Sequence, residues 1–155
     1  MTHSQTTPLF RERMTALATH LGTSYDEPWA DEWDAYEPYF GCGIGVTLDR
    51  GDNPDYYILT NEEADTAVES YIEENLRYFT PDFLENILQI EEEALASLLR
   101  KADADERLLQ LVNDGPGMPK FVKEAVESCG GRGHFTSSFD GKETKVGDFY
   151  IYRMN

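Results

Sequence analysis

The stretch DYYILTNEEA, residues 55–64, constrains the fold most strongly, because a strand pattern runs directly into a helix pattern. Residues 55–60 are rich in aromatic and branched side chains, which favour a strand. Thr60 and Glu63 then have the spacing of a capping box, which marks the start of a helix. Apolar residues recur behind it at helical spacing: Ala64, Val68, Tyr71, Ile72, Leu76 and Phe79. The sequence therefore predicts a sheet combined with helices.

Turn and cap signals place the other elements. A helix is expected over about residues 8–21, ending at Gly22, and another from Pro119 to Cys129. Strands are expected at 43–48, 55–60, 134–139 and 148–153, as two hairpins. A helix is expected to restart at Thr80 and Pro81, and further helical segments are expected at Leu95–Leu99 and Leu108–Val112. A chain of 155 residues fits one domain. We predict a single α+β domain over residues 1–155, with about four antiparallel strands and helices packed on one face.

The segment SYDEPWADEWDAYEPYF, residues 24–40, alternates aromatic and acidic side chains. If it were helical between its prolines, Trp29 and Trp33 would lie on an aromatic side and the acidic residues on the other. One interpretation is an irregular segment whose aromatic residues close over the core. The other is a recognition element, because Trp and Tyr are favoured anchors in protein interfaces.

The net charge is −17, from 30 acidic and 13 basic residues. The imbalance lies before residue 120, since residues 120–155 carry slightly more basic than acidic side chains. Such an acidic body repels nucleic-acid phosphates and anionic membranes, so we expect no direct binding to nucleic acid or membrane. Basic proteins are the expected partners. The alternative is that the charge serves only solubility.

One helix concentrates this charge. Behind the capping box, its predicted outer face carries Glu62, Glu63, Asp65, Glu69, Glu73 and Glu74. Glu62, Asp65, Glu69 and Glu73 step by three or four residues and therefore line one side of the helix. Ordered carboxylates of this kind could imitate the phosphates of a nucleic acid and bind a basic partner.

The segment GRGHFTSSFDGKETKVGDFYIYRMN, residues 131–155, offers a different candidate site. It contains Arg132, His134, Asp140 and Arg153, with serines between them. Histidine suits acid–base chemistry because its ordinary pKa lies near neutral pH, and a serine can act as a nucleophile. On a strand, however, His134 and Ser138 would lie about 13 Å apart, which argues against an assembled triad. We therefore interpret the segment first as a hairpin and second as a site.

Other motifs exclude common cofactors. Cys42 and Cys129 lie far apart and outside any CxxC pattern, so neither a zinc site nor a disulfide framework is expected. The turn at residues 49–55 lacks EF-hand spacing, and GCGIG lacks the GxGxxG spacing of a dinucleotide site. We predict no metal and no cofactor. No apolar run is long enough to cross a bilayer, and MTHSQTTPLFRERM lacks the apolar core of a signal peptide, so a cytoplasmic setting is expected.

The combination of LTNEEAD with the C-terminal GRGHFTSSFDGKE and FYIYRMN resembles a family of small uncharacterised proteins encoded by tailed bacteriophages and related mobile elements. The resemblance covers residues 55–79 and 119–155. The family more often has Tyr-Asp-Gly and a terminal Arg-Thr-Asn where this chain has Phe139-Asp140-Gly141 and Arg153-Met154-Asn155. The resemblance implies a phage origin and a host-cell setting, and it implies no reaction.

Three hypotheses of function follow. The favoured one is a phage accessory protein that inhibits a host nucleic-acid-binding defence protein, such as restriction or CRISPR machinery, through a DNA-mimicking acidic surface. The second is a small enzyme or ligand-binding protein with a site around His134. The third is a structural or regulatory phage component. The oligomeric state is left open by the sequence.

Overall fold

The computed structural model describes residues 8–155, so the N-terminal MTHSQTT segment lies outside the described residues. The chain divides into two compact units. The first combines the chain up to Val68 with Gly130–Asn155, and the second is Glu69–Cys129. That both units belong to one domain stays a prediction. The second unit is inserted between two parts of the first.

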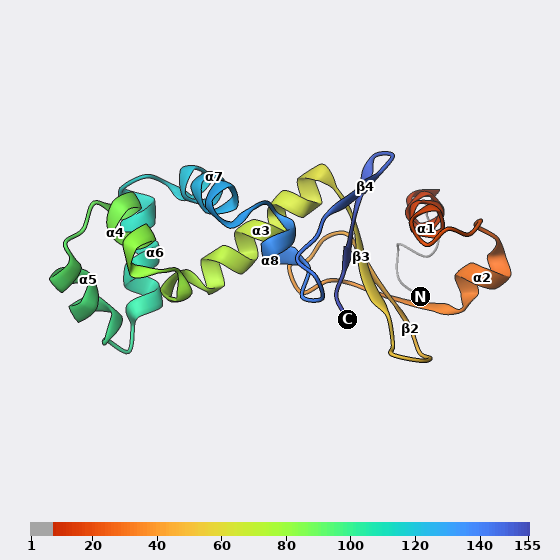
Figure 1. Ribbon diagram of the computed structural model, residues 1–155, viewed down its shortest axis with the longest axis horizontal. Coiled ribbons are helices and arrows are strands. Elements are labelled where there is room, and N and C mark those ends of the chain that lie inside the picture. Colours follow the sequence, from red (N-terminus) through yellow and green to blue (C-terminus); the bar gives the residue numbers. More distant parts are fainter. Residues whose placement is uncertain (1–7) are drawn as a thin grey trace. The chain divides into compact units, whose positions relative to one another are not determined.

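The first unit is built on an antiparallel sheet of five strands in the order β1-β2-β3-β5-β4 (Figure 1). The strands are β1 (Trp33–Tyr36), β2 (Ile44–Leu48), β3 (Asp55–Thr60), β4 (Thr144–Val146) and β5 (Phe149–Arg153). The α+β class and the first predicted hairpin, β2 with β3, are confirmed. The predicted number of strands was one too low, because β1 adds an edge strand beside β2.

The second predicted hairpin exists, but its first strand was misplaced. Residues 134–139 are not a strand; most of them belong to the short helix α8 (Gly133–Thr136) and the turn that follows it. Phe135, Thr136 and Ser137 are buried in succession, whereas a strand would bury alternate residues. The strand that forms the hairpin with β5 is β4, and the two are joined at Gly147, whose φ of 60° suits a tight hairpin turn.

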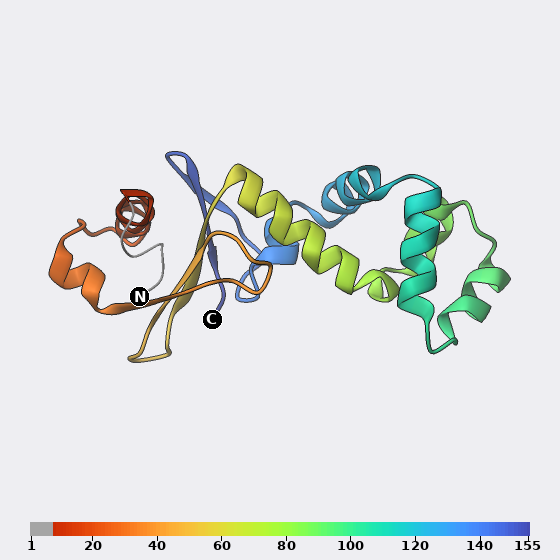
Figure 2. The ribbon, with the colours of Figure 1, turned by 180° about the vertical axis from the view of Figure 1, so that it is seen from behind.

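Helices cover both faces of the sheet, so the prediction of helices on one face was wrong. On one face, Met14 and Leu17 of α1 (Pro8–His20) pack against a core that includes Ile58. On the other face, Ala64 and Ala67 of α3 (Asn61–Glu74) belong to a cluster with alternate residues of the strands. Figures 1 and 2 show α1 and the start of α3 on opposite sides of the sheet. The predicted helix at residues 8–21 is confirmed.

The aromatic segment folds as a short helix followed by the edge strand. Asp26 caps α2 (Glu27–Asp31) by accepting a hydrogen bond from the backbone N–H of Trp29, 2.8 Å away. Trp33 begins β1 and is 5% exposed, with its ring 6.0 Å from that of Trp29. The ring of Tyr56 lies 6.0 Å from Trp33 on the other side. These aromatic residues therefore close over the core, while the acidic residues between them are exposed.

The second unit is helical. It contains the end of α3, the 3-10 turn η2 (Leu76–Tyr78), α4 (Pro81–Leu88), α5 (Glu92–Leu99), α6 (Ala104–Asp114) and α7 (Met118–Cys129). The helix predicted to restart at Thr80 and Pro81 is confirmed as α4, and Thr80 caps it by accepting a hydrogen bond from the backbone N–H of Phe83. Phe79, Phe83 and Phe121 form an aromatic cluster with ring separations of 5.2 to 5.4 Å. This cluster joins α4 to α7 and gives the unit its own core.

A buried ion pair links α1, β3 and α3 in the first unit. Arg13, which is 3% exposed, donates hydrogen bonds to both carboxylate oxygens of Glu63 at 2.6 and 2.9 Å and to the carbonyl of Ile58 at 2.6 Å. Glu63 also accepts a hydrogen bond from the backbone N–H of Thr60, which confirms the capping box. Burial disfavours the charged carboxylate, but Arg13 and Thr60 outweigh it and lower the pKa of Glu63.

We expect Trp33→Ala to lower the free energy of unfolding by about 3 to 5 kcal/mol, because it deletes a large buried aromatic side chain. Urea denaturation followed by circular dichroism measures this. The control is Tyr39→Ala, since Tyr39 is 58% exposed. Equal stability of the Trp33→Ala and Tyr39→Ala proteins would contradict the assignment of Trp33 to the core.

We expect Glu63→Gln to cost about 3 kcal/mol, because it leaves the Arg13 charge buried without its counter-ion. The control is Glu32→Gln, whose partner Arg50 is 66% exposed and whose loss should cost less than about 1 kcal/mol. Folding lowers the pKa of Glu63, so the ionised carboxylate contributes its full stabilisation above the pKa of the unfolded chain, about 4.3. This stabilisation is lost as the pH falls through the lower pKa of the folded state. Denaturation at neutral and acidic pH should therefore show a smaller penalty for Glu63→Gln in acid; a penalty unchanged with pH would contradict the ion pair.

Candidate functional site

The carboxylates predicted on the outer face of α3 are exposed, with one exception. Glu62, Asp65, Glu69 and Glu73 all lie on the exposed side of the helix. Glu63 does not belong to that face, because its side chain turns inward to Arg13 and is 20% exposed. The acidic face of α3 therefore consists of Glu62, Asp65, Glu69 and Glu73.

Many other acidic residues have a structural explanation. Carboxylates in the first turn of a helix are stabilised by the unpaired N–H groups and the helix dipole. First-turn acids occur in α3, α4, α5 and α6: Glu62, Glu63, Asp82, Glu92, Glu93, Asp105 and Glu106. Their presence requires no partner.

The acidic residues at the other end of α3 have no such explanation. Glu73 and Glu74 stand in its last turn, where the helix dipole disfavours negative charge, and that turn contains no basic residue. Among the described residues, no salt bridge joins Glu69 or Glu73 to a basic side chain. These carboxylates therefore do not stabilise their own helix.

One carboxylate of the face is already paired. Asp65 accepts a hydrogen bond of 2.9 Å from Arg132, which also donates to Glu143 at 2.9 Å and to the backbone and side-chain oxygens of Asn61. The guanidinium of Arg132 lies 4.6 Å from the centre of the Tyr150 ring. Arg132 thus fastens the segment after α7 to the first turns of α3.

The protonation states in this network are fixed by their neighbours. Partial burial works against the charge of Arg132, but its hydrogen bonds, first to Glu143 and then to Asp65, raise its pKa. Burial, followed by the nearby Glu143 carboxylate, raises the pKa of the Tyr152 phenol, which donates a hydrogen bond to that carboxylate. We define Arg132, Asp65, Glu143 and Tyr152 as the Arg132 network.

Ser137 and Asp140 have structural roles. The Ser137 hydroxyl is buried and lies 3.0 Å from the Asp140 carboxylate and 2.6 Å from the carbonyl oxygen of Arg153. The backbone N–H of Lys142 donates to Asp140 and lowers its pKa, with a smaller contribution from Ser137. Gly141 follows with a φ of 70°, which makes Asp140 and Gly141 part of a tight turn. The hydroxyl that a nucleophile would need is therefore already engaged.

The four residues of the alternative site are not joined to one another by hydrogen bonds or ion pairs in the described part of the chain. His134 is exposed on α8 and packs edge-on against Phe135. Arg153 pairs with Asp52 at 3.0 Å and stacks 3.9 Å from the Phe139 ring centre. Within residues 8–155, no hydrogen bond or salt bridge joins any two of Arg132, His134, Asp140 and Arg153.

Metal and membrane signals were also sought in the part of the chain that the structure describes. It contains no group of three or more His, Cys, Asp or Glu residues placed to hold a metal ion. In the same residues, no helix is both long and apolar enough to cross a bilayer. Of the turn aspartates, Asp52 pairs with Arg153 and Asp55 accepts a hydrogen bond of 2.5 Å from the Tyr36 hydroxyl.

Comparison with protein-family models, with curated proteins and with solved structures gave no match for this chain. The resemblance to phage proteins therefore stays a prediction from sequence.

We expect Arg132→Gln to lower the free energy of unfolding by about 2 kcal/mol, because several charge-assisted hydrogen bonds lose their donor. His134→Ala should change it by less than about 0.5 kcal/mol, as expected for an exposed side chain without hydrogen bonds in the described chain. Urea denaturation compares the two. Equal destabilisation would contradict the assigned roles, and a stable His134→Ala protein that lost its activity in cells would support the enzyme hypothesis.

Proposed function

We propose that this protein acts by binding and not by catalysis, and that the acidic face of α3 engages a basic, nucleic-acid-binding surface of a partner protein. In this proposal it is a phage accessory protein that inhibits a defence protein in the host cytoplasm by occupying its nucleic-acid site. The observation that carries the proposal is the pair Glu69 and Glu73, which are exposed and lack salt bridges among the described residues. Glu73 also lies in the last turn of α3, where the helix dipole disfavours negative charge.

The spacing of the acidic face suits such a partner. Successive carboxylates three or four residues apart lie about 5 to 6 Å from one another on a helix. From Glu62 to Glu73 the row extends about 16 Å along the axis, at a rise of about 1.5 Å per residue. A row of lysine and arginine side chains that binds a nucleic-acid backbone presents cations at similar intervals. Successive turns of the helix therefore offer that surface a row of negative charge.

The geometry of the first turns of α3 supports the proposal further. They are held by the capping box and by Arg13, and Arg132 braces Asp65. Carboxylates on these braced turns lose little conformational freedom on binding, which favours affinity. No comparable observation favours the alternative of an enzyme around His134, and the alternative of a structural or regulatory phage component predicts no special role for Glu69 and Glu73.

We expect Glu69→Lys combined with Glu73→Lys to abolish partner binding while the protein stays folded, because both substitutions place like charge against a basic surface. The charge-matched control is Glu12→Lys combined with Asp49→Lys, since both residues are exposed and lie outside α3. The measurement is capture of nucleic-acid-binding proteins from bacterial lysate on the immobilised chain, at low and high salt. Retention should fall as salt rises, because salt screens exposed charges.

Competition with duplex DNA separates DNA mimicry from non-specific electrostatic binding. A partner held through its nucleic-acid site should be released by a double-stranded oligonucleotide, and a partner held elsewhere should remain bound. Two results would contradict the proposal. One is equal retention of the partner by the Glu69→Lys, Glu73→Lys protein and by its charge-matched control. The other is retention of the partner that duplex DNA does not reduce.

A further inference from the structure

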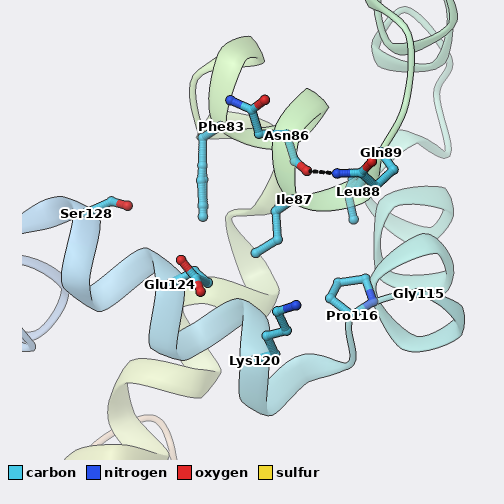
Figure 3. Close-up of a pocket in the computed structure, with 10 residues that line it drawn as sticks. All are labelled: Phe83, Asn86, Ile87, Leu88, Gln89, Gly115, Pro116, Lys120, Glu124 and Ser128. Carbon is cyan, nitrogen blue, oxygen red and sulfur yellow. Dashed lines mark hydrogen bonds between the residues drawn. The ribbon is translucent and has the colours of Figure 1, made fainter.

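The helical unit contains a groove of about 720 Å³ between α4 and α7. Its lining residues come from α4 and the residue after it, from the turn between α6 and α7, and from α7 itself (Figure 3). They are Phe83, Asn86, Ile87, Leu88, Gln89, Gly115, Pro116, Lys120, Glu124 and Ser128. A volume of this size is typical of sites that hold a ligand.

The two walls of the groove differ in chemistry. Phe83 and Ile87 of α4 point into it and give one wall an apolar surface (Figure 3). Lys120, Glu124 and Ser128 lie at four-residue intervals on α7 and form a polar wall. In the part of the chain that the structure describes, neither Lys120 nor Glu124 takes part in a salt bridge. One unpaired cation and one unpaired anion are therefore available to an occupant.

The groove is held open by its own backbone. Gln89 ends α4 in the left-handed region, with φ of 54°, and its side-chain amide donates a hydrogen bond of 2.7 Å to the carbonyl of Asn86. On the other side, the N–H of Gly117 donates to the carbonyl of Val112 at 2.7 Å and fixes the turn before α7. The Phe83 ring is stacked on that of Phe79, with 5.2 Å between their centres. A preformed groove costs an occupant less than one that must open.

The dimensions match a short extended peptide. The polar wall from Lys120 to Ser128 is about 12 Å long at about 1.5 Å per residue, which is the length of about four residues of extended chain. Phe83 and Ile87 are one helical turn apart, or about 6 Å, and alternate side chains of an extended peptide are about 7 Å apart. Two side chains of one peptide, separated by a single residue, would therefore reach both positions.

The charges decide which peptide fits. The carboxylate of Glu124 and the Phe83 ring line the same groove from α7 and α4 (Figure 3), and an anion and an aromatic ring in one groove suit a guanidinium or ammonium group. Ile87 and Pro116 suit an apolar side chain, and Lys120 suits a peptide carbonyl oxygen. We propose that this groove binds a short extended peptide segment of a partner protein in which a basic and an apolar side chain are separated by one residue. This site is distinct from the acidic face of α3 and does not depend on the function proposed for that face.

The test is a fluorescence-anisotropy titration of the full chain with fluorescein-labelled, capped pentapeptides. The probes contain Arg-Ala-Leu and Leu-Ala-Arg, and the control probes replace Arg by Gln or by Glu, or Leu by Ala. We expect saturable binding of at least one Arg-containing probe, weakened about tenfold when Gln replaces Arg, since a charge-assisted hydrogen bond is lost. Replacing Leu by Ala should also weaken it.

Matched variants locate the site. Glu124→Gln should weaken the Arg-containing probe about tenfold and remove its advantage over the Gln-containing one, whereas Glu127→Gln, an exposed α7 residue outside the groove, should change neither. Lys120→Gln should weaken both probes alike. The proposal would be overturned by any one of four results. These are no saturable binding, equal affinity for the Arg and Gln probes, equal effects of Glu124→Gln and Glu127→Gln, and preference for the Glu probe. If no partner is captured through the acidic face of α3, the function proposed for that face fails, and the outcome of these peptide titrations is unaffected.

Discussion

The buried pair between Arg13 and Glu63 is the interaction on which the arrangement of the first unit depends. An arginine that is 3% exposed requires a counter-ion, because an uncompensated charge in the interior costs several kcal/mol. Glu63 supplies the charge and also caps α3, so that α1, the end of β3 and the start of α3 must assemble together. The direction in which the first turns of α3 present Glu62 and Asp65 follows from that assembly.

Local patterns in the sequence predicted the elements whose geometry is set by neighbouring residues. The capping box of Thr60 and Glu63, the first hairpin and the helix at residues 8–20 needed only spacing and turn signals. The strand expected at residues 134–139 was wrong because Phe135, Thr136 and Ser137 are buried together by tertiary packing. Edge strand β1 was missed because its acidic and aromatic residues also fit helical spacing.

The candidate site divides in the same way. Helical periodicity was enough to place Glu62, Asp65, Glu69 and Glu73 on one side of α3. Periodicity could not reveal that Asp65 pairs with Arg132, 67 residues away, or that Glu63 turns inward to Arg13, 50 residues away. The sequence carried two signals of the pair between Arg13 and Glu63. One was a capping glutamate, and the other was an arginine within an otherwise apolar helical stripe. Pairings between distant residues follow from the packed fold and leave no spacing in the sequence.

The insertion of the helical unit has a consequence for how the chain assembles. β3 pairs with β5 near the middle of the sheet, yet all of Glu69–Cys129 lies between them in sequence. During synthesis, β1, β2 and β3 emerge first, and β3 exposes an unpaired edge until β5 has been made. The helical unit, whose contacts are closer in sequence, can fold during that interval. The nascent chain therefore leaves open the edge of β3 that will pair with β5, with its run of aromatic and aliphatic residues, while the helical unit is being made, and this interval is where aggregation competes with folding.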